Sequence, residues 1–250
     1  MGWNFLATRN YAEAARIFDR AVKASPGTFT IRDLRARVDF YQKGDLRPMG
    51  QVLDATPETP DPNGTILLTR YNYEMFRRNF AGLLSILERS SALTSRGETS
   101  APIPKSFLQG NVYAAMKDEA KAKAKYEEAR AIVEQKVREN PVDAPRHALL
   151  GLVYAGLGRS KEAVAEGNRA VELLPETKDA FDGPILTVSR ARISVKCGDA
   201  DVALGILERS LEIPAGITVP ELQFDPTWDP LRNHPRFQQM LTKHGGAQSK

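Results

Sequence analysis

Residues 144–175 read APRHALLGLVYAGLGRSKEAVAEGNRAVELLP, and this stretch decides the fold. Apolar residues recur in it at helical spacing over two segments, which predicts two amphipathic helices joined by a short turn. Gly158 falls just past the first segment, where a left-handed helix end is easiest for glycine. Pro175 ends the second segment, because proline cannot continue the hydrogen-bond ladder of a helix. The residues that set the pattern are Gly151, Tyr154, Gly158, Ala163, Ala170 and Pro175.

The same pattern recurs along the 250-residue chain. The positions equivalent to Ala163 are Ala14, Met49, Leu83, Ala122, Ala163 and Ala203, at steps of 35, 34, 39, 41 and 40 residues. Self-similarity at such a period indicates stacked supersecondary units, each burying its apolar face against the next. Besides the pair in 144–175, the expected helices cover 11–24, 28–43, 46–56, 63–78, 80–93, 103–117, 119–139, 179–197, 200–211 and 230–243. Residues 94–104 are expected to be a loop, and four prolines predict an extended crossing segment over 213–228.

These residues resemble the tetratricopeptide repeat (TPR), whose first helix carries Gly-x-x-Tyr and whose second carries Ala-x-x-x-Phe-x-x-Ala, closed by Pro. Gly167 stands where that family has an aromatic residue, which implies a local packing deficit. The resemblance implies an all-α, TPR-like right-handed superhelical solenoid of about six antiparallel helix pairs plus a C-terminal closing helix. We expect one solenoid domain over 1–244 with a truncated first repeat and a point of subdivision near 94–104. A disordered tail is expected over 245–250.

The C-terminal part is similar to a narrower family of bacterial TPR regions. The residues that carry this likeness are Leu173-Leu174-Pro175, Asp182-Gly183-Pro184 and the run Phe224-Asp225-Pro226-x-Trp228-Asp229-Pro230-Leu231-Arg232. Such regions follow effector modules in serine/threonine kinases, class III nucleotide cyclases and winged-helix regulators. The resemblance implies a non-catalytic protein–protein interaction scaffold, the regulatory or docking region of a larger bacterial signalling protein. The alternative is a regulatory segment of a multidomain enzyme, a kinase or nucleotide cyclase, whose catalytic domain lies outside this chain.

Candidate catalytic and metal-binding patterns are missing from the sequence. The three histidines and the single Cys197 do not give metal-ligand spacing, and neither a Gly-x-Ser-x-Gly elbow nor a Walker loop occurs. His147 is expected to pack inside the fold. We therefore expect no enzymatic activity, no metal and no cofactor.

Charge and hydropathy restrict the partners. The net charge of +4 is spread over interspersed acidic and basic residues, so no nucleic-acid partner is expected. No apolar run approaches the ~20 residues that a bilayer span needs, so no membrane insertion is expected. The expected compartment is the cytoplasm, or the periplasm if the full-length protein carries an upstream membrane span.

The expected function lies on the concave side, which the first helix of each pair lines in this architecture. By helical phase, the peptide-binding groove contains Tyr41, Asn72, Met75, Phe76, Phe107, Asn111, Arg192 and Lys196, together with Leu34, Val38 and Leu152. Amides, cations and apolar side chains together suit an extended peptide or a domain of the same full-length protein, and the two cations favour acidic segments. The alternative that these residues only coat the groove or pack against the crossing segment stays open.

Two further binding modes follow from the family. Some TPR domains clamp a C-terminal carboxylate with Asn, Lys and Arg on successive first helices. Asn72 and Asn111 fall at matching phases here, but the cooperating cations are not in adjacent repeats, so this clamp is not expected. Self-association is expected if the truncated first repeat exposes a face around Phe5, Phe18 and Val22.

Overall fold

The computed structural model describes residues 2–57, 61–92, 94–96 and 101–245. The described part of the protein is all-α, with 74% of its residues in helices. The helices are α1 (Gly2–Ala7), α2 (Tyr11–Ala24), α3 (Phe29–Lys43), α4 (Arg47–Asp54), α5 (Thr65–Phe76), α6 (Phe80–Arg89), α7 (Lys105–Ala115), α8 (Glu119–Glu139), α9 (Ala144–Gly156), α10 (Ser160–Leu173), α11 (Asp182–Lys196), α12 (Ala200–Ser210), α13 (Val219–Phe224), the 3₁₀-helix η1 (Pro226–Leu231) and α14 (Pro235–Gly245). Two short strands, β1 (Thr94–Arg96) and β2 (Pro102–Pro104), pair between α6 and α7.

Helix positions follow the apolar pattern closely. Tyr11–Ala24 and Glu119–Glu139 coincide with the expected ranges, and the other expected helices are found a few residues shorter or shifted. All six positions equivalent to Ala163 are buried, at 5% exposure or less. Small or apolar residues at these crossings let the helices of a pair approach closely, as the sequence predicts.

Each turn from a first helix to a second contains one residue in the left-handed conformation. Gly44, Gly158 and Gly198 have φ of 70°, 74° and 83°, which confirms the expectation for these glycines. Arg9, Arg78 and Lys117 hold the same place with φ of 57°, 58° and 61°. A left-handed non-glycine residue costs free energy, so three of these turns accept strain and keep a long cationic side chain.

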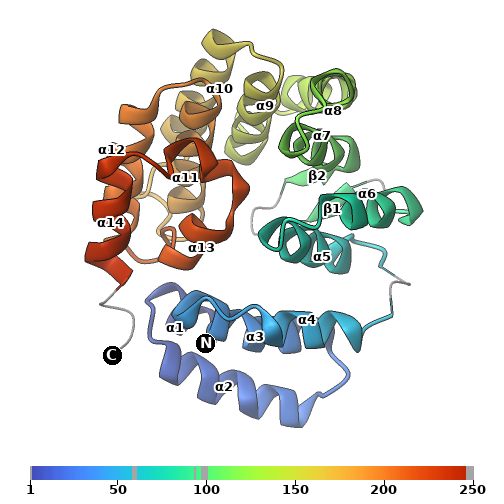
Figure 1. Ribbon diagram of the computed structural model, residues 1–250, viewed down its shortest axis with the longest axis vertical. Coiled ribbons are helices and arrows are strands. Elements are labelled where there is room, and N and C mark those ends of the chain that lie inside the picture. The colour runs from blue at the N-terminus through green and yellow to red at the C-terminus, as the bar shows by residue number, and fades with distance from the viewer. Residues whose placement is uncertain (1, 58–60, 93, 97–100, 246–250) are drawn as a thin grey trace.

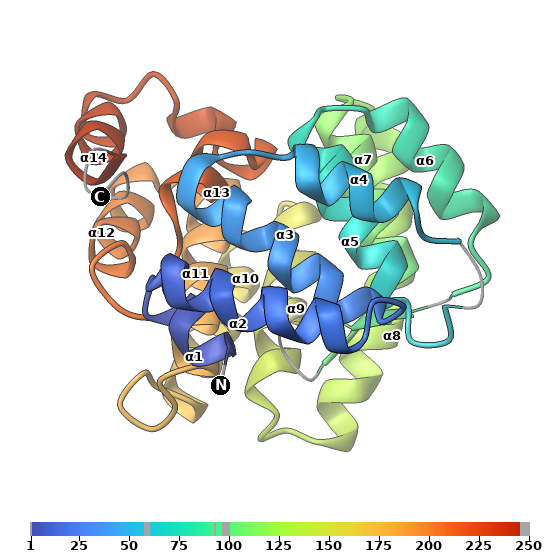
Figure 2. The same ribbon diagram turned by 90° about the horizontal axis from the view of Figure 1, so that it is seen from below.

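The described part of the chain closes on itself. Figure 1 shows the helices following one another around an arc until α13 and α14 lie beside α1 and α3. Figure 2 shows from below that α13 lies against α3, and α13 and α3 are in contact. Most other helix contacts join elements that are close along the chain, so this contact between the two ends is an addition to the packing of neighbouring helices.

Polar contacts hold the closure at two places. The Arg9 guanidinium donates to the backbone oxygens of Leu211 and Ile217, and the Ala215 N–H donates to the Ala7 carbonyl at 2.8 Å. Arg78 forms a bidentate ion pair with Asp229 at 2.6 and 2.7 Å.

An aromatic cluster closes the same seam between the ends. Phe40 on α3 stacks on Phe76 at 5.0 Å between ring centroids, and it meets Phe224 edge-on at 5.8 Å. The Phe224 ring also lies against Gly44, at 3.1 Å from where a Cβ would stand. The closure is therefore both apolar and charged.

Three local expectations are corrected by the structure. Residues 213–228 are not simply extended, because they contain α13 and the start of η1. Pro220 and Pro226 stand in the first turns of these helices, where a backbone N–H has no partner within the helix and proline is tolerated. The expected loop over 94–104 pairs at its ends, with Ser95 opposite Ile103 in the antiparallel register. The disordered tail was expected to begin at Gly245, but Gly245 belongs to α14. Residues 246–250 lie outside the described residues.

The expectation that the first unit exposes Phe18 is also wrong. Phe18 is only 6% exposed, because α1 packs over α2 and Gly2 lies against the Phe18 ring. Phe5 packs against the same core, and Val22 is half-buried. The large apolar side chain exposed on α1 is Trp3, at 45%.

Candidate functional site

The inner side of the arc encloses a cavity of about 1170 Å³. Most of its lining comes from the first helix of each pair, α1, α3, α5, α7, α9 and α11, and from the C-terminal segment that closes the ring. Met49, Phe80, Ala101 and Ile103 add to the lining from other elements. Sites for single small molecules span roughly 300–1000 Å³. The cavity therefore has room for a ligand larger than a metabolite.

The structure places all eight expected groove residues on this cavity. They come from four helices: Tyr41 from α3; Asn72, Met75 and Phe76 from α5; Phe107 and Asn111 from α7; Arg192 and Lys196 from α11. Leu34 and Leu152 also line it, whereas Val38 is 1% exposed in the N-terminal core and does not. Helical phase thus identified which side of each first helix faces inward.

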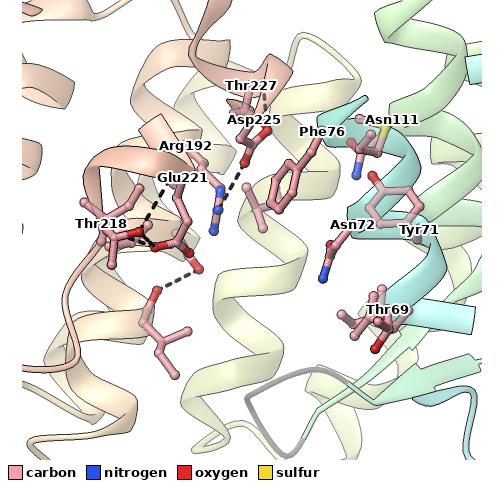
Figure 3. A pocket seen from close by; sticks show the side chains of 18 of the residues that line it. Thr69, Tyr71, Asn72, Phe76, Asn111, Arg192, Thr218, Glu221, Asp225 and Thr227 are labelled. Carbon is pink, nitrogen blue, oxygen red and sulfur yellow. Dashed lines mark hydrogen bonds and ion pairs between the residues drawn. The ribbon is translucent and has the colours of Figure 1, made fainter. Parts of the chain in front are cut away.

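The apolar residues of the groove differ in how much surface they offer. Met75 and Phe107 are each only 7% exposed, so most of their surface belongs to the core. Phe76 is half-buried, and its ring is held against Phe40 in the closing aromatic cluster. Asn72 is half-buried, and Figure 3 shows it beside Phe76 on the wall opposite Arg192 and Asp225.

A polar cluster forms the floor between α5, α7, α8 and α11. The Tyr126 hydroxyl donates to Asn111 Oδ1 at 2.8 Å, and Tyr71 also hydrogen-bonds Asn111. Lys196 Nζ lies 3.5 Å from both Asn111 Oδ1 and the Tyr126 hydroxyl, and 5.7 Å from the centre of the Tyr126 ring. Two oxygen-bearing side chains, Asn111 and Tyr126, therefore lie next to the Lys196 ammonium group, and Tyr71 joins the cluster through Asn111.

Burial dominates the electrostatics of this floor. Desolvation lowers the pKa of Lys196 below its ordinary value, against the opposing effect of the Asp225 charge. Desolvation raises the pKa of Tyr71 and of Tyr126, so both hydroxyls stay protonated. The floor thus holds one desolvated amine among neutral partners.

Arg192 is already engaged by the closing segment. Its guanidinium lies 3.2 Å from Asp225 Oδ2 (Figure 3). It also lies 5.6 Å from the centre of the Trp228 ring. Asp225 also accepts from the Thr227 N–H, so its carboxylate is fixed as the cap of η1. The charge of Arg192 is therefore balanced within the chain.

Sequence reasoning missed three members of this site. Tyr71 lies next to the expected groove residue Asn72, and Tyr126 lies on the second helix α8, which was not expected to line the groove. The available signal was that Tyr126 follows Ala122 by four residues, as Phe18 follows Ala14, so a tyrosine stands at a buried position. A buried tyrosine hydroxyl needs a polar partner, which predicts polar side chains nearby. Asp225 was assigned to the crossing segment, and no local pattern places that segment against α11.

His147 takes a structural place outside the cavity. It is 7% exposed, which confirms the expected packed position. One ring nitrogen lies 2.5 Å from Glu166 Oε2 and the other 3.0 Å from the Pro141 carbonyl oxygen. Across the described residues, no group of three or more His, Cys, Asp and Glu side chains is placed to hold a metal ion.

No protein-family model matches the chain, and no curated protein is significantly similar to it. None of the helices in the described ranges has both the length and the apolar character that crossing a membrane requires.

Proposed function

We propose that this chain is a TPR-like solenoid that binds an extended peptide segment of another protein, or of its own full-length protein, in the cavity. The proposed repeat is supported by the backbone. The left-handed turn residues Arg9, Gly44, Arg78, Lys117, Gly158 and Gly198 follow one another at steps of 35, 34, 39, 41 and 40 residues. Those steps equal the steps between the six buried positions equivalent to Ala163, which run from Ala14 to Ala203.

One observation carries the binding role: the first helices of successive pairs all contribute to one cavity, which is larger than most small-molecule sites. Its wall alternates half-buried apolar side chains with amides such as Asn72 and Asn111. Amides match the backbone groups of an extended chain, and apolar pockets receive its side chains. The proposal is therefore a non-catalytic scaffold.

The larger setting is proposed from the sequence resemblance alone. We propose the docking or regulatory region of a bacterial signalling protein, and the alternative remains a regulatory segment of a kinase or nucleotide cyclase. An in-frame catalytic domain in the full-length gene would support the alternative. A full-length gene without one would contradict it.

The binding proposal is tested by filling the cavity. Asn72→Trp puts a bulky ring on the cavity wall, and Val164→Trp puts the same ring at a 41% exposed position of α10 that does not line the cavity. Peptides selected by the purified protein from a random display library are expected to bind Asn72→Trp at least roughly tenfold more weakly, a loss typical of a blocked binding pocket. They should bind Val164→Trp as they bind the wild type.

Two outcomes would contradict peptide binding in the cavity. One is that the library yields no enriched peptide with a measurable dissociation constant by calorimetry. The other is that both tryptophan variants bind the selected peptides equally well while retaining the helical circular-dichroism spectrum of the wild type.

A further inference from the structure

Residues 211–231, here called the strap, run along the turns of the first three helix pairs. The turn residues Arg9, Gly44 and Arg78 occupy equivalent places, and each is in the left-handed conformation. All three contact the strap, and they meet it in chain order, from its start to its end. The strap therefore binds a row of equivalent turns, one from each of three successive pairs.

The contacts between the strap and these turns are mostly polar. Arg9 donates to two backbone oxygens near the start of the strap. Near its end, Asp229 pairs with Arg78 at 2.6 Å, and the two side chains are 39% and 44% exposed. Between them, the Phe224 ring lies against Gly44. Phe224 is the strap residue that packs in the apolar clusters of the N-terminal helices.

On its other side the strap is anchored in the C-terminal core. Leu222 and Trp228 are 0% exposed there, and Ile217, Val219 and Leu231 are at most 3% exposed. Burial of several large apolar side chains stabilises far more than a half-exposed ion pair does. If the ring opens, it therefore parts between the strap and the turns, and the strap stays with the C-terminal core.

The strap also forms part of the cavity wall, to which Thr218, Asp225 and Pro226 belong. While the seam is closed, the chain surrounds the cavity as a ring (Figure 1). An extended ligand then reaches the cavity only by threading a free end through the ring. A segment that has folded domains on both sides has no such end, so it requires the ring to part.

We propose that the seam between the strap and the turns of Arg9, Gly44 and Arg78 is the entry gate of the cavity, which parts as one unit to admit an internal segment of a partner protein and then closes over it. The proposal deepens the proposed peptide binding and rests on it for the nature of the ligand. The turns support it, because a left-handed non-glycine residue costs free energy. At Arg9 and Arg78 the long side chain provides a seam contact that glycine could not make.

A disulfide across the seam tests the opening without any ligand. A Cβ at Gly44 would lie 4.0 Å from Pro220 Cβ, within the roughly 3.5–4.5 Å that disulfides span. Gly44→Cys and Pro220→Cys are therefore combined, and Cys197, the single native cysteine, is replaced by serine. The oxidised and reduced forms of this one protein differ only in the cross-link.

Hydrogen exchange of the Ala215 amide reports the opening, because this N–H donates to the Ala7 carbonyl across the seam. Oxidation is expected to slow the exchange by roughly tenfold or more, since the cross-link excludes the open ring. The Trp228 amide bonds the Asp225 carbonyl within the strap, and its exchange should stay the same. Equal Ala215 exchange in both forms would overturn the proposal, and so would equal slowing of both amides, which would mean that the strap unfolds.

A second pair of variants tests the opening without new cysteines. Arg78→Gln removes the ion pair with Asp229, and the matched control Lys117→Gln removes a cation from the left-handed turn between α7 and α8. Arg78→Gln is expected to speed Ala215 exchange by roughly two- to fivefold, as loss of a half-exposed ion pair does, and Lys117→Gln is not. Because Ala215 lies at the other end of the seam, equal exchange in the two variants would contradict a seam that parts as one unit.

The entry role is tested with a library-selected peptide that carries a small folded protein at each end. The control is the same peptide with a folded protein at one end, which keeps a free end for threading. The oxidised cross-link is expected to slow association of the doubly capped peptide by roughly tenfold or more, to slow the control less, and to release both on reduction.

The outcomes separate the gate from the proposed function. Equal association of the doubly capped peptide with the oxidised and reduced forms would overturn the gate and leave peptide binding in the cavity standing. Equal slowing of both peptides would support the gate and exclude threading. A library without binding peptides would contradict the proposed function, and the exchange measurements would still decide whether the seam opens.

Discussion

The Tyr126 ring is clamped between two glycines, and this contact allows a quantitative prediction. A Cβ at Gly110 on α7 would stand 2.8 Å from two Tyr126 ring carbons, and a Cβ at Gly156 on α9 would stand 2.6 Å from two others. The ring is 1% exposed, and its hydroxyl is fixed by the bond to Asn111. Gly110→Ala therefore forces the ring or a helix to shift.

The magnitude is the difference of two effects. Overpacking a close-packed site costs about 1–3 kcal/mol, and two ring contacts at 2.8 Å place this case in the upper half of that range. Replacing glycine by alanine inside a helix returns about 1 kcal/mol. The net loss is about 1–2 kcal/mol, which lowers Tm by about 2–8 °C in a chain of this size.

Thermal unfolding followed by circular dichroism measures the effect, with Gly205→Ala as the matched control. Gly205 lies inside α12, and a Cβ there meets nothing within 4 Å. The control should gain about 1 kcal/mol, or about 2–4 °C in Tm. If Gly110→Ala is stabilised as the control is, the ring is not clamped and the reasoning fails.

A double variant isolates the contact. Tyr126→Leu removes the ring that the new methyl group meets, so Gly110→Ala should cost less in that background than in the wild type. Equal costs in the two backgrounds would assign the destabilisation to another cause.

Two further predictions concern the turns and the tyrosines. Lys117→Gly relieves a left-handed residue and should stabilise the fold by up to about 1 kcal/mol in urea unfolding, whereas Arg78→Gly should gain about 0.2–1 kcal/mol less because it also breaks a half-exposed ion pair with Asp229. Equal gains at low salt would show that this ion pair does not stabilise the closure. Burial raises the pKa of Tyr11 and Tyr154 to about 12, so native protein at about pH 11 should show less tyrosinate absorbance at 295 nm than unfolded protein, whose tyrosines ionise near pH 10. The protonated hydroxyls contribute stability that is fully present below about pH 10 and is lost as pH rises through the folded values, and identical titration curves would contradict the raised pKa values.

The sequence determines much of the fold because local signals mark the helices. Period-3.6 apolar patterns, helix-ending glycines and capping residues act within a few positions, so α2 and α8 could be predicted to the residue. The inward face of each first helix follows from helical phase, which explains why all eight expected groove residues line one cavity. These features do not depend on the distant parts of the chain.

The ring closure depends on distant parts and could not be predicted in the same way. Small rotations between successive helix pairs accumulate along the stack, and one sequence does not fix each rotation. Whether Asp225 meets Arg192, or Phe224 meets Phe40, is decided only by that sum. The expectation of an extended segment over 213–228 was also wrong for a local reason, because prolines that forbid a long helix begin short ones.

The seam between the ends has a consequence for the order of folding. Arg9 bonds Ile217 across 208 residues, whereas most helix contacts join chain neighbours. Neighbouring helices can form and pack without closing a long loop, and the seam alone bears the entropy of bringing the ends together. Assembly therefore finishes at the seam, and amide hydrogens there, such as that of Ala215, should exchange with solvent before those of the central helices.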